Sequence, residues 1–149
     1  MTPKIVYIDM DDTLCDFSGA YHYHLSINPK IQYPQSQYGF FANLHPLPGA
    51  ISAVKALIHS EKYDPYILTA PSVLNPLCYT EKRIWIENHF GIEFVDKLII
   101  SPNKSLLKGD ILIDDNIEGK GQDLFEGYLI HFGSNGYPDW NSIRRELDF

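Results

Sequence analysis

The strongest constraint on the fold is a repeated alternation of short apolar segments with segments of helical periodicity. Five runs rich in Ile, Val, Leu and Tyr have the length of buried strands. They are 4–8, 66–68, 97–100, 111–113 and 128–132. Because strands that alternate with helices pair in parallel, this order predicts an α/β fold with a central parallel sheet and helices on both faces. Such sheets bind ligands beyond the carboxyl ends of their strands, where we expect the chemistry.

Three helices are predicted between and after these strands. The first covers 49–60 and carries an apolar stripe formed by Ile51, Val54, Leu57 and Ile58. The second covers 79–90 and offers Ile84 and Trp85 for packing on the sheet. The third covers 140–147.

The segment 17–48 interrupts the alternation. It contains no Asp or Glu and is rich in Tyr and Phe. We interpret it as a small cap insert over the strand ends, helical near 18–25 and irregular through Pro29 and Pro34. For any one tyrosine of the insert, ordinary packing is the first interpretation, because aromatic side chains mostly serve cores. The length of 149 residues fits a single domain, 1–149, that contains this insert.

Composition excludes several classes of protein. A net charge of −7 and a pI near 5.2 argue against a nucleic-acid polymer as partner, since such proteins display basic surface to phosphates. The first residues lack the long apolar run of a signal peptide or membrane span, so we expect a cytoplasmic protein with no membrane partner. Cys15 and Cys78 are too few for a disulfide framework and lack zinc-site spacing.

Polar side chains follow four of the predicted strands. Asp9, Asp11 and Thr13 follow the first and Thr69 follows the second. Lys104 lies beyond the third, and Asp114 and Asp115 follow the fourth. Because the carboxyl ends of parallel strands meet at one edge of a sheet, these groups are expected to converge.

Several carboxylates at one buried edge repel one another unless a cation lies among them. Oxygen ligands without His or Cys favour Mg²⁺ over zinc. We therefore predict a Mg²⁺-dependent phosphatase in which Asp9 attacks phosphorus as the nucleophile. Asp11 acts as general acid and then general base, while Thr69 and Lys104 bind the phosphate.

Each of these motifs has a bland alternative. A single DxD after a strand is often only a turn that caps a helix. Thr69 alone is a strand-end hydroxyl that bonds backbone, and Lys104 alone is a solvated loop lysine. The order of the four motifs along the chain is what favours a catalytic site.

The segments DMDDT, ILTA, NKS and GDILIDD, in this order, resemble the four motifs of the haloacid dehalogenase-like (HAD) superfamily. Four longer segments are similar to the 5′(3′)-deoxyribonucleotidase family, which hydrolyses nucleoside monophosphates with Mg²⁺. They are FFANLHPLPGAISAVKAL, ILTAP, EKRIWIENHFG and NKSLLKGDILIDD.

The resemblance implies a Rossmann-like sheet of strand order 3-2-1-4-5 and a small-molecule nucleotide substrate. It makes Asp9 the nucleophile and a metal ligand, and Asp11 the acid and base and a metal ligand through its carbonyl. Asp115 would complete the metal ligands, and whether Asp114 binds the metal directly stays open. Phe17 falls where that family lines its base pocket with an aromatic side chain.

Two features depart from the family pattern. Asp12 stands where many members have glycine, a change expected to matter little because other superfamily members carry DxDDT. The insert is also shorter than the usual helical cap, and in this family the cap chooses the substrate. Another small phosphomonoester therefore remains an alternative substrate, and a receiver-like domain that accepts phosphate on Asp is a further alternative. The order of the lysine and the second acidic pair disfavours the receiver. The sequence also leaves a homodimer open.

Two further motifs carry weaker signals. His22 and His24 form an HxH without a third metal ligand at a sensible spacing, so we interpret them as surface histidines. The segment 119–124 has two glycines but matches no P-loop or dinucleotide fingerprint, and we predict a mobile loop there.

Overall fold

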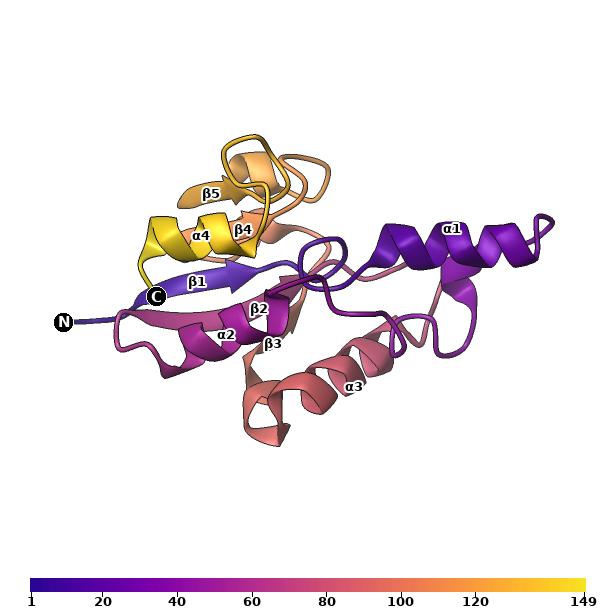
Figure 1. Cartoon of the computed structure of the whole chain (residues 1–149), viewed down its shortest axis with the longest axis horizontal. Helices are drawn as coiled ribbons and strands as arrows, with labels where there is room; N and C mark the ends of the chain where they lie inside the picture. The colour runs from indigo at the N-terminus through magenta and orange to yellow at the C-terminus, as the bar shows by residue number, and fades with distance from the viewer.

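The computed structural model describes residues 1–149, and Figure 1 shows its helices and strands. The strands are β1 (Lys4–Ile8), β2 (Tyr63–Thr69), β3 (Leu98–Ile100), β4 (Ile111–Asp114) and β5 (Tyr128–His131). The α-helices are α1 (Phe17–Ile27), α2 (Ala50–His59), α3 (Cys78–Phe90) and α4 (Trp140–Leu147). The 3₁₀ helices are η1 (Pro34–Ser36), η2 (Ile92–Lys97), η3 (Lys104–Leu106) and η4 (Gln122–Leu124). None of the helices combines the length and apolar character needed to cross a bilayer.

The five strands form one parallel sheet of order β3-β2-β1-β4-β5, which confirms the predicted fold class and strand order. In its centre, Tyr7 of β1 pairs with Tyr66 of β2 on one side and Leu112 of β4 on the other. All arrowheads point toward the same edge in Figure 1. The residues that follow β1, β2 and β4 therefore meet at that edge.

The two faces of the sheet are covered differently. One face carries the larger apolar core, in which Val6 and Ile8 pack with side chains of α2, α3 and α4. The other carries a small cluster of Tyr7, Leu68, Leu112 and Phe125. The prediction of helices on both faces needs correction in one respect, because the second face is covered by loops with only the 3₁₀ helices η3 and η4. The connections 101–110 and 115–127 contain no α-helix.

The predicted element boundaries lie close to those observed, with two differences. Strand β2 begins at Tyr63 rather than Tyr66, because the segment before it continues the pairing with β1. In α3, Trp85 packs on the core as expected, but Ile84 is exposed and Ile86 is buried instead. The buried stripe of α3 runs through Cys78, Glu81, Lys82 and Trp85. Its two charged members hide the apolar periodicity on which the prediction depended.

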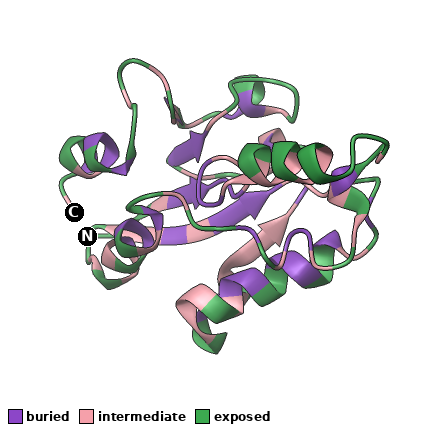
Figure 2. Cartoon of the chain, turned by 45° about the vertical axis from the view of Figure 1, so that its right-hand side comes forward, coloured by how far each residue is buried: buried purple, intermediate pink, exposed green.

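The two ends of the segment 17–48 lie side by side and are joined by backbone hydrogen bonds. The Leu47 amide donates to Leu14 O at 2.8 Å, and the Asp16 amide donates to His45 O at 2.8 Å. Between these ends the segment forms α1 and η1, and Figure 1 shows α1 beyond the arrowheads of the sheet. No residue of α1 is fully buried, as its green and pink ribbon in Figure 2 shows.

The aromatic residues of this segment divide into two groups. Phe40 and Phe41 are buried in the large core. Tyr23 and Tyr38, by contrast, are exposed, so ordinary packing is the wrong interpretation for these two. They lie on a helix and a turn that cross the open end of the sheet, where no further layer covers them.

Candidate active site

A cleft of about 260 Å³ opens at the carboxyl ends of the strands. It is walled by strand-end residues, by the loop after β2 and by two parts of the 17–48 segment. Its lining comprises Asp9, Asp11, Phe17, Gln35, Phe41, Thr69, Ala70, Pro71, Ser72, Lys104, Asp114, Asn116, Lys120 and Gln122. The cleft lining thus contains Asp9, Asp11, Phe17, Thr69, Lys104 and Asp114 of the residues singled out from the sequence, whereas Thr13 and Asp115 lie outside the lining and contact each other.

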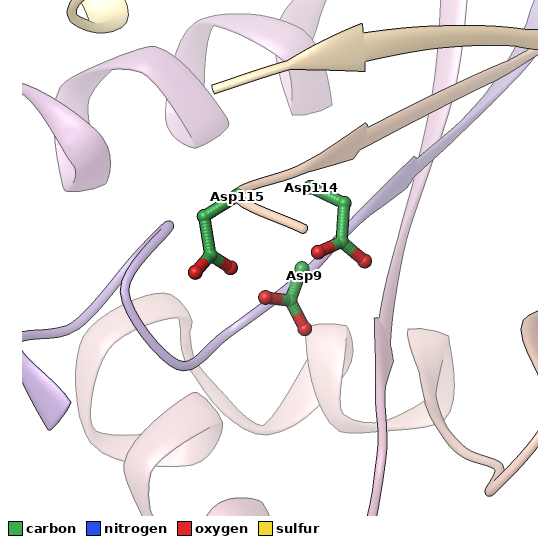
Figure 3. Close-up of side chains that lie close together, drawn as sticks. All are labelled: Asp9, Asp114 and Asp115. Atoms are coloured by element: carbon green, nitrogen blue, oxygen red, sulfur yellow. The ribbon is translucent and has the colours of Figure 1, made fainter. Parts of the chain in front are cut away.

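Three carboxylates form the acidic centre of the site. Oxygens of Asp9, Asp114 and Asp115 all lie within 4.8 Å of one another, and Figure 3 shows the three side chains converging from the ends of β1 and β4. The Thr13 hydroxyl lies between Asp9 (3.3 Å) and Asp115 (3.2 Å). Burial and the neighbouring Asp9 raise the pKa of Asp115 to about 8. The charge of this cluster is therefore under-compensated by the protein alone, as expected for residues that hold a cation.

Lys104 supplies the positive charge on one side of this cluster. Its Nζ donates to Asp9 Oδ1 at 2.8 Å and to Asp114 Oδ2 at 2.5 Å, and its side chain is 2% exposed. Burial alone would lower the pKa of Lys104, but the attraction of Asp9 and Asp114 outweighs it and raises the pKa. The lysine is therefore a fixed cation between two strand ends, not the solvated loop lysine of the alternative interpretation.

Asp114 and Asp115 differ in the number of hydrogen bonds that their carboxylates accept from the protein. Asp114 is fully buried and accepts from Lys104, from the Asn116 amide (2.9 Å) and from Gln122 Nε2 (3.3 Å). Asp115 accepts from the Thr13 hydroxyl and, at 3.4 Å, from the Asn116 side chain. Asp115 thus has the greater unused capacity for a further ligand.

Asp11 is held by a lysine that the sequence analysis missed. Lys82 of α3 is fully buried, and its Nζ donates to Asp11 Oδ2 at 3.1 Å, to Thr69 Oγ1 at 2.5 Å and to Ala70 O at 2.9 Å. Burial raises the pKa of Asp11, while the charge of Lys82 acts in the opposite direction. Lys82 joins the ends of β1 and β2, so it orients both the predicted acid and the predicted phosphate-binding hydroxyl. In the sequence, the helical spacing of Lys82 from Cys78 and Trp85 could have indicated that this lysine is buried.

Glu81, next to Lys82, ties α3 to the 17–48 segment. Its carboxylate is 6% exposed and accepts from the amides of Gly39 (3.1 Å), Phe41 (3.0 Å) and Ala42 (3.3 Å). Two adjacent residues of α3 therefore hold different parts of the site. Lys82 bonds the ends of β1 and β2, and Glu81 bonds the insert at Gly39, Phe41 and Ala42.

Asp12 explains one departure from the family pattern. Its backbone adopts φ +61°, a left-handed conformation that glycine adopts freely and aspartate tolerates better than most residues. The carboxylate also accepts from the amide (2.9 Å) and hydroxyl (2.6 Å) of Ser18 in the first turn of α1. The aspartate thus keeps the turn and adds a helix cap that glycine lacks.

Aromatic side chains form the apolar part of the cleft lining. The rings of Phe17 and Phe41, both in the cleft lining, have centroids 6.0 Å apart, and Phe40 packs edge-on against Phe17 at 5.5 Å. Neither His22 nor His24 belongs to the metal-compatible cluster of the structure. Burial, followed by the charge of Asp11, raises the pKa of Cys15 well above its usual value, so a thiolate is disfavoured there.

The segment 119–124 packs against the turn that carries Lys104. Lys120 O accepts from the Lys104 amide at 2.6 Å, and Gln122 is 3% exposed. Gly121 has φ +84°, and a Cβ there would lie 2.1 Å from Asn103 Oδ1. The predicted loop is therefore part of the wall of the site, with a glycine required by close backbone approach.

A family model described as "5′ nucleotidase, deoxy (Pyrimidine), cytosolic type C protein" matches residues 26–137. The matched range contains Thr69, Lys104, Asp114 and Asp115. Asp9 and Asp11 precede it.

Three related proteins extend the match. A protein of Vibrio phage KVP40 named for 5′(3′)-deoxyribonucleotidase activity is 41% identical over 143 residues, or 93% of this chain and 81% of the phage protein. The human cytosolic-type 5′(3′)-deoxyribonucleotidase is 38% identical over 57% of this chain and 42% of its own length. The mouse mitochondrial 5′(3′)-deoxyribonucleotidase is 33% identical over 70% of this chain and 42% of its own length. The chain thus spans less than half the length of the two mammalian relatives.

Two solved structures share the fold across the whole chain. The HAD hydrolase YfnB of Bacillus subtilis, in a structure bound to magnesium, has a TM-score of 0.66 at 13% identity, with 100% of both chains covered. A hydrolase from Streptococcus pneumoniae TIGR4 has a TM-score of 0.60 at 12% identity, also with 100% of both chains covered. At these identities the likeness establishes the HAD-type fold.

Proposed function

The chain belongs to the family of cytosolic type C 5′-nucleotidases, and on this premise we propose that it hydrolyses nucleoside monophosphates, deoxyribonucleotides among them, to nucleoside and phosphate. The observation that carries the proposal is the convergence of Asp9, Asp11, Lys104 and the Asp114–Asp115 pair around one cleft. The family is named for nucleotide phosphatases, and these groups are the ones that phosphoryl transfer through a carboxylate needs.

Asp9 is the nucleophile of the proposed reaction. Its carboxylate attacks phosphorus, the bond from phosphorus to the ester oxygen breaks, and a phosphoryl-aspartate forms. Asp11 gives its proton to the departing nucleoside oxygen; the raised pKa of Asp11 favours the protonated form that this step requires. Asp11 then takes a proton from water as the water oxygen attacks phosphorus, which releases phosphate and restores Asp9.

Lys104 and Thr69 bind the phosphate in this proposal. Lys104 lies between Asp9 and Asp114 and offers its charge to the oxygens of the transferring group. Lys82 Nζ donates to Thr69 Oγ1 and so fixes the position of this hydroxyl at the end of β2, where it would bind a phosphate oxygen. Phe17, which lines the same cleft, would contact the nucleoside.

The acidic cluster fits a Mg²⁺ ion. Three carboxylate oxygens within 4.8 Å of one another, with the pKa of Asp115 and Asp114 raised, form a hard-oxygen donor set that needs positive charge. Asp9, Asp115 and the Asp11 carbonyl would hold the ion, and Asp114 would instead hold Lys104. Bound there, Mg²⁺ would neutralise the charge of the phosphate and of Asp9.

The test is phosphate release from a panel of deoxyribonucleoside and ribonucleoside monophosphates, with Mg²⁺ and with chelator. Sugar phosphates without a base form the comparison set, because the short insert leaves another small phosphomonoester as the competing substrate. We expect turnover of nucleotides that stops when the metal is removed. Turnover of sugar phosphates alone would reject the nucleotidase assignment and keep the phosphatase chemistry.

A further inference from the structure

Gln35, a residue of the cleft lining, carries a buried hydrogen-bond acceptor that has no partner. Its Oε1 is the buried side-chain oxygen or nitrogen of this structure that has no hydrogen-bond partner. The residue belongs to η1 of the 17–48 segment and lines the cleft together with Phe17 and Phe41. A buried acceptor left without a donor costs free energy, so such an atom calls for a ligand or another explanation.

Several polar groups at the strand ends are already engaged with one another. Lys104 bonds Asp9 and Asp114, Gln122 bonds Asp114, and Lys82 bonds Thr69. These groups account for the phosphate end of the site, whereas the free acceptor belongs to the segment that supplies the aromatic wall. The substrate portion that meets Gln35 is therefore the part remote from the phosphate.

The backbone of Gln35 is fixed in place by the loop after β2. Asn75, which is 1% exposed, donates from Nδ2 to Gln35 O at 2.8 Å. The next residue, Ser36, donates its hydroxyl to Leu74 O at 2.7 Å. Buried Pro34 begins η1 and restricts the backbone before Gln35. Because these contacts already order the backbone of Gln35, ligand binding loses less conformational entropy at this residue.

Building on the proposed function, we propose that Gln35 recognises the nucleobase: its carboxamide oxygen accepts a hydrogen bond from a base N–H while the base packs against the aromatic surface of the insert. A carboxamide offers an acceptor and a donor side by side. Uracil and thymine present N3–H beside a carbonyl, and cytosine presents its 4-amino group beside N3, so each pyrimidine edge matches a carboxamide. The aromatic surface of Phe17 and Phe41 favours a base over a sugar hydroxyl as the donor.

The experiment compares three substrates on the wild-type protein with Mg²⁺: dTMP, N3-methyl-dTMP and deoxyribose 5-phosphate. Methylation removes the N3–H donor and leaves the phosphate unchanged. We expect kcat/KM to fall about tenfold or more for the methylated nucleotide, the loss expected for one uncharged hydrogen bond with its acceptor left buried. This arm uses no variant, so it stands even where a substitution impairs folding.

The second arm uses Gln35→Met, which keeps the length of the side chain and removes its polar end. We expect about a tenfold fall in kcat/KM for dTMP, no further loss on N3-methylation, and unchanged turnover of deoxyribose 5-phosphate. The matched control is Gln32→Met, since Gln32 is exposed in the same segment and bonds only the neighbouring Tyr33 hydroxyl. This control should behave as the wild type with all three substrates.

The outcomes separate this inference from the proposed function. If the wild type releases phosphate from no nucleotide, the proposed function fails. If it hydrolyses dTMP and N3-methyl-dTMP equally, or Gln35→Met weakens dTMP and deoxyribose 5-phosphate alike, the nucleotidase stands and the base contact is wrong. If the loss caused by Gln35→Met disappears for a nucleotide that lacks its 3′-hydroxyl and persists on N3-methylation, Gln35 contacts the sugar and the base assignment is overturned.

Discussion

At the scale of single residues, two buried lysines from different parts of the chain organise the acids of the site. Lys104 bridges the nucleophile candidate Asp9 and Asp114, and Lys82 bridges the acid candidate Asp11 and Thr69. Each lysine therefore pairs with one of the two candidate catalytic carboxylates, and the two carboxylates lie in different environments. A site with two carboxylates in two settings can assign one to attack and the other to proton transfer.

Replacement of the two aspartates tests this division of roles. Asp9→Asn should abolish turnover, because an amide oxygen is a poor nucleophile toward phosphorus. Asp11→Asn should lower kcat by about 10²- to 10⁴-fold, the usual contribution of a general acid and base, and leave Mg²⁺ binding largely intact. Steady-state phosphate release and metal titration measure these effects. Asp96→Asn, at an exposed residue, is the control, and full activity of either active-site variant contradicts the mechanism.

Lys82→Met should destabilise the protein and impair catalysis together. The change leaves Asp11 without its buried partner, which costs about 3 kcal/mol of unfolding free energy at the low end for such pairs. Denaturant unfolding and phosphate release measure the two effects. Lys62→Met is the control, since Lys62 pairs with Asp148 at the exposed surface and its removal should leave stability almost unchanged. A Lys82→Met protein with normal stability and kcat would show that the lysine positions neither group.

At the scale of elements, helices and turns set the positions of the side chains proposed to contact the substrate. Helix α1 carries Phe17 at its first position, and Asp16 caps this end by accepting from the Gly19 amide at 2.8 Å. The turn at η3 carries Lys104 and rests on Gly121. Because neither element is large, one cap or one glycine contributes a substantial part of its stability.

Asp16→Ala should loosen the first turn of α1 and raise KM for nucleotides severalfold. Loss of an N-cap costs about 1 kcal/mol of helix stability, and here the affected turn holds Phe17. The matched control is Asp139→Ala, which removes the N-cap of α4. Asp139 accepts from the Ser142 amide at 2.8 Å, and neither residue lines the cleft. Thermal unfolding should show similar losses for both variants. An equal rise in KM for both would refute a role of the α1 cap in substrate binding.

Gly121→Ala should weaken phosphate binding. The new Cβ meets Asn103 Oδ1 and the Ser105 amide, so the turn that holds Lys104 has to shift. Gly119→Ala offers a close control, because Gly119 also has positive φ but no atom lies within 4 Å of its Cβ position. Both variants place alanine at a positive φ and so strain the backbone, but only Gly121→Ala should raise the inhibition constant of inorganic phosphate. Identical behaviour of the two would exclude the steric explanation.

At the scale of the whole molecule, an acidic protein concentrates further negative charge at its own active site. The chain has a net charge of −7, and the acids of the cleft add local repulsion that Lys82 and Lys104 offset only in part. A phosphate monoester adds more negative charge. We therefore expect binding of such a ligand to depend on a cation held at the site rather than on the field of the surface.

The stability of the metal-free protein should depend on pH in a defined direction. The folded-state pKa of Asp115 is about 8 and its ordinary value is 3.8, so between these values the folded state binds more protons than the unfolded state. In chelator, the contribution of Asp115 to stability therefore falls as pH rises from about 4 toward 8. Thermal midpoints of wild type and Asp115→Asn across this range isolate the effect.

Added Mg²⁺ should reduce this decline, because the ion takes the place of the proton at Asp115. For the same reason the apparent affinity for Mg²⁺ should rise with pH. A midpoint difference between wild type and Asp115→Asn that is constant from pH 4 to pH 8 would contradict the raised pKa.

The sequence by itself determined the sheet and the edge at which the chemistry lies. Strand runs, their alternation with helices and the polar residues at strand ends are local features, so Asp9, Thr69, Lys104 and Asp114 could be predicted to meet at one edge. Parallel pairing then leaves little freedom, because all carboxyl ends face the same way.

Only the tertiary structure decided which further groups complete the site. Lys82 and Glu81 interrupt an apolar stripe, and their partners lie far away in the sequence, as with Lys82 and Asp11, 71 residues apart. Likewise Gln35 is one of several glutamines in its segment, and only its unsatisfied buried oxygen distinguishes it. Burial of a polar group is favourable or costly according to the partner that folding brings to it, and local sequence carries no record of that partner.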